Sequence, residues 1–230
     1  MRKAVTLAFC AACAFPSVAR AEPSDEEVTD KLTFIERRLG AGTAEANRWS
    51  YGWLATFGTL SVAQFGIALG VKDPGFRADM AVGSVACSFG VLTFAIPPFT
   101  PRFAASQLAA WPERTPEERR RKLVRAEELL KKSAEVERLG HGVLPQVAGI
   151  GVSVGFGLVL SLAYNRIRTG MMNTAVGIAL VETQIFTQPT TAIDDWNDYQ
   201  KGSLYGARHS HGTSIAIVPS PSGINIAGAF

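Results

Sequence analysis

The chain has 230 residues, and 23 lysines and arginines against 20 aspartates and glutamates give it a net charge of +3. Its 47% hydrophobic content excludes an intrinsically disordered chain, and three cysteines are too few for a disulfide-rich scaffold. The charge is too small to indicate a nucleic-acid-binding protein. Charged residues make up only 19% of the chain, and most apolar residues gather in long uncharged blocks.

The first 21 residues are typical of a secretory signal peptide. Met1-Arg2-Lys3 is a short basic segment, residues 4–18 are mostly apolar, and Ala19-Arg20-Ala21 has the A-x-A pattern of a cleavage site. The apolar stretch is too short to span about 30 Å of hydrocarbon. A lipid-modified Cys13 is the alternative interpretation. Cleavage after residue 21 would leave Cys87 as the one cysteine of the mature chain.

Residues 22–50 are predicted to form an amphipathic helical segment. Ser24 and Glu27 have the spacing of a capping box, and Gly40 is expected to end the helix. Such a helix would lie on the membrane surface, dock on a partner, or dock onto the protein's own helices. Its apolar stripe, with spacings of four, three and four, consists of Val28, Leu32, Ile35 and Leu39.

Four long blocks predict membrane-spanning helices. Three of them lack any charge over 20 or more residues, which at 1.5 Å per residue matches the hydrocarbon core of a bilayer. Barrel strands would alternate apolar and polar residues, and these blocks do not. A soluble bundle with unusually apolar core helices is the competing interpretation. The blocks are residues 51–71, 80–99, 142–164 and the less apolar 171–189.

Small residues spaced four apart inside the blocks indicate close helix packing, because they let two backbones approach in lipid. Packing within one four-helix unit and association with a second copy are both open. These residues are Gly149, Ser153 and Gly157, then Gly151 and Gly155, and finally Gly66 and Gly70.

Between the second and third blocks, residues 100–141 predict a charged helical loop. Thr115 and Glu118 form a second capping box with Pro116 at the first helical position, and Gly140 is expected to end the helix. Glutamates lie four residues before cations along it, as in the pair of Glu118 and Lys122, which favours a solvated helix.

Two signals disagree about orientation. A cleaved signal peptide places both termini and the 100–141 loop outside the cytoplasm. That loop holds ten lysines and arginines, whereas the turns at residues 72–79 and 165–170 hold two each, and the positive-inside rule prefers the reverse arrangement. We take the signal peptide as the stronger signal, because a folded loop that also carries seven acidic residues can cross the membrane.

The last residues change character. Isoleucines alternate on both sides of residues 219–223, which predicts a β-hairpin with a five-residue turn. The alternating residues that end at Phe230 resemble the terminal strand of outer-membrane barrels. That resemblance implies an outer-membrane-associated protein, although the rest of the chain lacks the many alternating strands of a barrel.

Few residues offer chemistry. Glu182 lies inside the fourth block with Gln184 nearby, and Gln64 in the first block is a possible hydrogen-bond partner. A carboxylate inside a membrane span costs free energy, so such a residue usually faces the interior of a helix bundle or a transport pathway. The alternative is that the span ends early and Glu182 lies among lipid headgroups. Residues 151–155 match the G-x-S-x-G pattern of a serine hydrolase around Ser153, but inside an apolar block.

The sequence therefore predicts an all-α protein of the bacterial inner membrane, with four spans and a short C-terminal β-hairpin. We expect a non-catalytic structural or partner-binding role, with no cofactor or metal, and with lipid, another membrane protein or a second copy as the partner. A small transporter or channel component using Glu182 is the alternative, followed by an outer-membrane-associated protein or a serine hydrolase. The predicted segments are the signal peptide (1–21), the amphipathic segment (22–50), the first membrane hairpin (51–99), the charged loop (100–141), the second membrane hairpin (142–189) and a polar tail with the β-hairpin (190–230).

Overall fold

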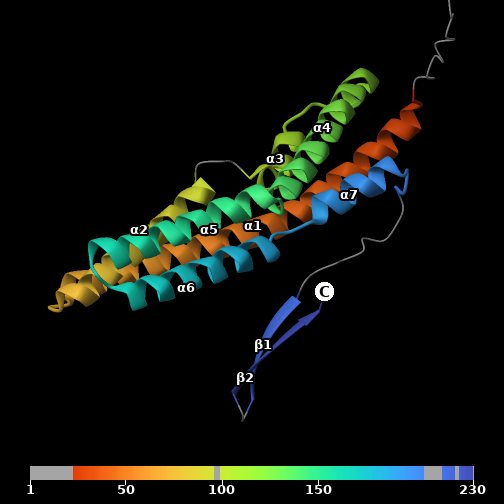
Figure 1. The fold of residues 1–230 in the computed structure, drawn as a ribbon. Helices are drawn as coiled ribbons and strands as arrows, with labels where there is room; N and C mark the ends of the chain where they lie inside the picture. The colour runs from red at the N-terminus through yellow and green to blue at the C-terminus, as the bar shows by residue number, and fades with distance from the viewer. Residues whose placement is uncertain (1–22, 96–98, 205–213, 221–222, 230) are drawn as a thin grey trace, which may run out of the picture.

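A computed structural model describes residues 23–95, 99–204, 214–220 and 223–229, and helices dominate it (Figure 1). The predicted signal peptide lies outside these residues. The helices are α1 (Asp25–Gly70), α2 (Pro74–Ala95), the 3₁₀ turn η1 (Thr100–Arg102), α3 (Ala104–Ala109), α4 (Pro116–Gly140), α5 (Val143–Leu158), the π-helical turn η2 (Val159–Ala163), α6 (Ile167–Phe186) and α7 (Thr191–Gln200).

Two antiparallel strands follow, β1 (Ser214–Ser220) and β2 (Gly223–Ala229). Their register pairs Ser220 with Gly223, so two residues separate the strands and the five-residue turn expected from the sequence is wrong. Pro219 lies within β1 opposite Ile224. A proline can occupy this position because both strands of an isolated hairpin are edge strands.

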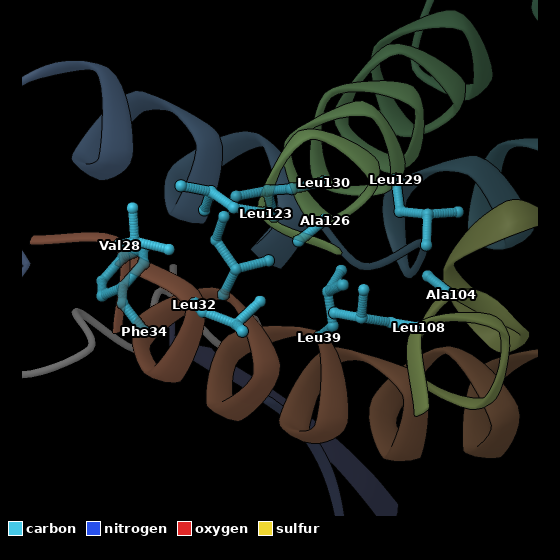
Figure 2. Close-up of a cluster of buried hydrophobic side chains, with 11 residues drawn as sticks. Val28, Leu32, Phe34, Leu39, Ala104, Leu108, Leu123, Ala126, Leu129 and Leu130 are labelled. Atoms are coloured by element: carbon cyan, nitrogen blue, oxygen red, sulfur yellow. The ribbon is translucent and has the colours of Figure 1, made fainter. Parts of the chain in front are cut away.

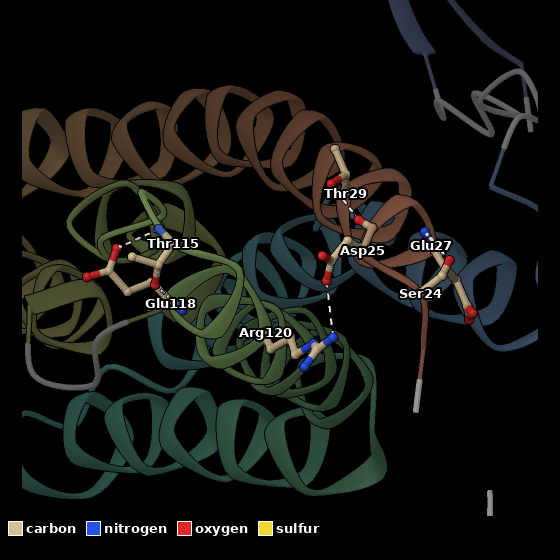
Figure 3. Close-up of polar contacts among 7 residues, drawn as sticks. All are labelled: Ser24, Asp25, Glu27, Thr29, Thr115, Glu118 and Arg120. Carbon is tan, nitrogen blue, oxygen red and sulfur yellow. Dashed lines mark hydrogen bonds and ion pairs between the residues drawn. The ribbon is translucent and has the colours of Figure 1, made fainter. Parts of the chain in front are cut away.

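The longest element corrects the sequence analysis. α1 runs unbroken through 46 residues, about 69 Å, so Gly40 does not end a short helix and the first span is not a separate element. A glycine inside a helix costs only about 1 kcal/mol, and packing along both halves of α1 offsets it. The helix begins as predicted, because the Ser24 side chain accepts a hydrogen bond from the Glu27 amide at 3.1 Å (Figure 3).

The amino-terminal half of α1 belongs to a compact region that we call the head: residues 25–47 with η1, α3, α4 and α7 (Figure 1). The predicted stripe is fully buried there, so this helix docks onto the protein's own helices. Figure 2 shows leucines of α1 and α4 meeting, with Ala104 and Leu108 of α3 at one end of the cluster. The buried apolar residues are Val28, Leu32, Phe34, Ile35, Leu39, Ala104, Leu108, Leu123, Ala126, Leu129 and Leu130.

The helix α4 forms as the sequence predicted. Thr115 accepts from the Glu118 amide, and the Glu118 carboxylate accepts from the Thr115 amide, each at 3.2 Å (Figure 3). The predicted pair of Glu118 and Lys122 is wrong: Glu118 is occupied by this cap, and Lys122 points inward to other partners described below. Arg120 contacts Asp25 at 3.1 Å, which ties the first turn of α1 to α4.

The carboxyl-terminal half of α1 belongs to a second region, which we call the bundle: residues 48–70 with α2, α5, η2 and α6 (Figure 1). Its helices form two hairpins, α1 with α2 and α5 with α6, which meet at Phe89 and Phe156 with ring centroids 5.6 Å apart. Among the described residues three helical segments are long and apolar enough to cross a membrane: α1, α2 and the segment Val143–Ala163. α6, which the sequence analysis expected to be a fourth span, is not apolar enough to be counted with these three.

Candidate functional site: the seams of the bundle and its junction with the head

The contact between α1 and α2 is a seam of hydroxyl groups. Ser61 Oγ donates to the Ser84 carbonyl at 3.0 Å, Ser84 Oγ donates back to the Ser61 carbonyl at 2.9 Å, and Ser61 Oγ lies 2.8 Å from Ser88 Oγ. One turn away, the Gln64 amide donates to Cys87 Sγ at 3.6 Å. Hydrogen bonds between serine side chains of neighbouring helices are common where helices pack in a membrane.

The outside of the same helices is apolar. Val62 and Leu69 of α1 are 74% and 73% exposed, and Leu162 of η2 is 79% exposed. In the head, by contrast, the apolar stripe of α1 is buried against the leucines of α4. α1 therefore changes along a single helix from a half whose apolar side chains are buried to a half whose apolar side chains are exposed.

The contact between α5 and α6 depends on small residues that the sequence analysis singled out. A Cβ added to Gly149 would lie 2.4 Å from Val181, and one added to Gly157 would lie 1.9 Å from Thr174 Oγ1. Ser153 packs in the same way against Gly177. These three positions therefore face α6 within one chain, where only a small residue allows the two backbones to approach.

The remaining small-residue pairs face outward. A Cβ added to Gly151 or Gly155 of α5, or to Gly66 or Gly70 of α1, would meet no described atom within 4 Å. These four residues therefore make no close helix contact within the described part of the chain.

The three residues proposed as an intramembrane polar site do not come together. Gln64 is occupied at the seam between α1 and α2, where its side chain packs on Gly83. Glu182 and Gln184 are half-buried on α6, and in the described part of the chain the Glu182 carboxylate makes no hydrogen bond or ion pair. Glu182 lies five residues, about 8 Å along the helix, before Thr187, which belongs to the junction described next.

Tryptophans mark the level at which the bundle meets the head. The indole N–H groups of Trp49 and Trp53 both donate to Thr187 Oγ1, at 3.3 and 3.1 Å. Trp49 also packs on Phe94 and Phe99, with ring centroids 5.3 and 5.4 Å away. We call these five residues the aromatic belt. Indole rings with one bonded polar edge are typical of the membrane–water interface.

Above the belt, buried charges join α7 to α1. Arg38 is 4% exposed and contacts Asp195 at 3.2 Å and Asp198 at 3.7 Å. Its guanidinium also lies over the Phe34 ring, 5.1 Å from the centroid. Asp195 and Asp198 of α7 are thus ion-pair partners of α1. A buried pair in this geometry fixes how α7 docks, because either charge alone would be costly there.

A second buried cation joins α4 to its surroundings. Lys122 Nζ lies 2.6 Å from Glu36 of α1 and 2.5 Å from Glu113. Burial alone would lower the pKa of Lys122, but the hydrogen bonds and charges of the two glutamates outweigh it, and the pKa is raised above its usual value. Lys122 therefore stays charged and fixes the angle between α1 and α4.

Glu137 of α4 caps the start of α7. Its Oε2 accepts hydrogen bonds from the amides of Ala192 and Ile193 at 2.8 and 3.1 Å, although Glu137 is only 1% exposed. Burial raises the pKa of Glu137 to about 8; the two amides oppose the rise, and the carboxylates of Glu45 and Asp195 add to it.

Beside Glu137 a cavity of about 10 Å³ is lined by Arg38, Ser133 and Asp195 among others, which is room for about one water molecule. Ser133 is fully buried there.

At the opposite end of the bundle one ion pair links the two hairpins. Arg166, in the turn before α6, donates from Nε and Nη2 to the two carboxylate oxygens of Asp79 on α2, at 2.7 and 2.5 Å. Asp79 is 6% exposed, so this paired arrangement also satisfies an otherwise costly buried charge.

The surroundings of Ser153 do not fit the serine-hydrolase interpretation. Ser153 lies in the middle of α5 and donates to the Gly149 carbonyl at 2.9 Å, whereas a hydrolase nucleophile needs a sharp turn between a strand and a helix. Within the described ranges no three His, Cys, Asp or Glu side chains are grouped to hold a metal ion, and His209 and His211 lie outside them.

The sequence analysis missed the seam serines, the aromatic belt and the capping role of Glu137. Two serines four residues apart, Ser84 and Ser88, and two tryptophans four residues apart around the start of the first block, Trp49 and Trp53, were the available signals. The partner of Glu137 lies 55 residues away and leaves no local pattern. Comparisons with protein-family models, with curated proteins and with solved structures found no significant match.

Proposed function

We propose that this protein is a non-catalytic membrane protein that holds a helical head at a fixed height above the inner membrane and presents it to a partner. The observation that carries the proposal is the change of polarity along α1. Serines face α2 and valines and leucines face outward in the bundle, while the head buries its leucines. Only a medium without water makes the first arrangement favourable.

The rigid connection between the two regions supports a role in presentation. α1 passes from the bundle into the head without a break, and α4 and α7 are attached to it by the buried ion pairs of Lys122 and Arg38. The outward face of α4 carries exposed Arg121, Lys131 and Glu135 beside Val124, which is 57% exposed. A mixed surface of charges around an apolar residue suits a protein partner.

The four-span arrangement is part of this proposal. α6 packs along α5 through Gly149, Ser153 and Gly157, so it would enter the membrane with α5. With the signal peptide removed, four spans leave the head, the tail with its proposed β-hairpin and both termini on the periplasmic side. The turns with Lys72, Arg77, Arg166 and Arg168 would then face the cytoplasm, although the ten cations of the 100–141 loop make the positive-inside rule prefer the reverse arrangement.

A pair of single-cysteine variants tests the anchoring and the orientation. Cys87 is replaced by serine, and a cysteine is introduced either at Arg121 in the head or at Arg168 in the turn before α6. Intact spheroplasts are then treated with a membrane-impermeant maleimide, before and after permeabilisation. We expect labelling at position 121 in intact cells and at position 168 only after permeabilisation.

The other outcomes are equally clear. The reversed labelling pattern would overturn the periplasmic placement of the head but not the anchoring. Labelling of both sites in intact cells would mean that α5 does not cross the membrane, which contradicts the four-span arrangement. Recovery of the chain in the soluble fraction after carbonate extraction would overturn the proposed function as a whole.

A further inference from the structure

Arg102 is a cation held in place beside the aromatic belt. It ends η1, which is fixed to α1 because Thr43 Oγ1 donates to the carbonyl of buried Pro101 at 2.9 Å. Arg102 Nε donates to Asn47 Oδ1 at 3.0 Å. The guanidinium lies 4.5 Å from the centroid of the Tyr51 ring and 5.3 Å from that of Phe103.

The outer edge of this guanidinium is unused. In the described part of the chain only its Nε has a hydrogen-bond partner, so the two terminal nitrogens have donors to offer. The planar fork of an arginine matches two phosphate oxygens, and contact with two rings and with Asn47 reduces the side-chain entropy lost on binding. The geometry is thus prepared for an anion with at least two oxygens.

The surroundings indicate which anion this is. Tyr51 and Phe103 flank the cation and are 58% and 40% exposed, and Tyr51 lies between the belt residues Trp49 and Trp53 on α1. A soluble phosphate would leave these rings in water, whereas a phospholipid covers them with its glycerol and acyl groups while its phosphate reaches the guanidinium.

We propose that Arg102, Tyr51 and Phe103 form a binding site for the headgroup phosphate of an anionic phospholipid in the leaflet beside the head. The inference rests on the proposed membrane location of the bundle. Arg102 supplies the paired donors, Asn47 orients it, and the two rings contact the lipid below its phosphate. The site would fix the height of the head above the membrane surface.

Quenching of the belt tryptophans tests the site in the full chain. Trp111 and Trp196, which lie in the head, are replaced by phenylalanine so that the emission comes from Trp49 and Trp53. The protein is reconstituted into phosphatidylcholine vesicles in which a growing fraction is phosphatidylglycerol or phosphatidylcholine brominated near the headgroup. The relative association constant of the two lipids follows from the two quenching curves.

We expect the association constant of phosphatidylglycerol to exceed that of phosphatidylcholine about fivefold. This is the effect of one arginine close to an anionic membrane surface. Arg102→Gln should reduce the preference to about one, and Arg102→Lys should retain only part of it. The control is Arg48→Gln, because Arg48 is exposed on α1 one turn from Tyr51 and should not change the preference.

Equal quenching by both lipids in the parent chain would overturn the site and leave the membrane location intact. An equal loss in the Arg48 and Arg102 variants would also overturn it, since a diffuse surface charge would then explain the preference. No quenching by either lipid would place the belt outside the membrane and contradict the proposed function itself.

Discussion

Glu137 leads to a prediction about pH. Its carboxyl group is buried, it caps α7 through the amides of Ala192 and Ile193, and its pKa is raised from 4.5 to about 8. A carboxyl group whose pKa is higher in the folded state binds its proton more tightly there. Its contribution to stability is therefore complete below about pH 4.5 and is lost as the pH rises through 8.

The magnitude follows from the same two values. At 1.36 kcal/mol per pH unit, the free energy of unfolding should fall by about 4 kcal/mol between pH 5 and pH 9 through this one group. Glu137→Gln removes the charge and keeps a side-chain oxygen that can accept from both amides. The variant should lack this part of the pH dependence and exceed the parent chain in stability by the largest margin at pH 9.

Amide hydrogen exchange in peptides from α7 measures this effect in the detergent-solubilised full chain. Opening free energies are compared for the parent and Glu137→Gln at pH 5, 7 and 9, after correction for the intrinsic exchange rates. The difference between the two chains isolates Glu137 from all other titrating groups. Two curves that run parallel from pH 5 to pH 9 would refute a carboxyl group with a raised pKa at this position.

Three further substitutions test the packing, each by unfolding in detergent. Arg38→Met leaves buried carboxylates without their cation and should destabilise the head by about 3–5 kcal/mol, whereas Arg37→Met, at an exposed site, should have little effect. Gly157→Ala places a Cβ against α6 and should cost about 1–3 kcal/mol, whereas Gly155→Ala, which meets open space, should cost nothing. Thr115→Ala removes one half of a capping box and should cost about 1 kcal/mol.

These comparisons can fail in distinct ways. An equal decrease in the free energy of unfolding for the Arg37 and Arg38 variants would mean that the ion pairs of Arg38 do not hold α7. A larger loss at Gly155 than at Gly157 would place the main contact of α5 with another molecule and not with α6. An unchanged unfolding transition in the Thr115 variant would mean that α4 does not need its cap.

The local elements could be predicted because their signals are local. The apolar stripe from Val28 to Leu39 and the capping box at Thr115 depend on residues within one or two turns, and both appear in the structure. The length and apolarity of α1, α2 and α5 likewise indicate membrane helices without any knowledge of their neighbours. Gly40 was expected to end a helix but lies inside α1, since a glycine ends a helix only where tertiary packing does not continue it.

The sequence by itself determined which segments are helical and which of them suit a membrane, because backbone hydrogen bonding and the burial of apolar surface act over a few residues at a time. Only the tertiary structure decided what these helices hold together. It joined two predicted segments into α1, brought Glu137 to α7 and Arg166 to Asp79, and placed the Gln64 side chain against Cys87 of α2. The two joined contacts link residues that are 55 and 87 positions apart along the chain, and their proximity depends on how whole helices dock and not on any local pattern.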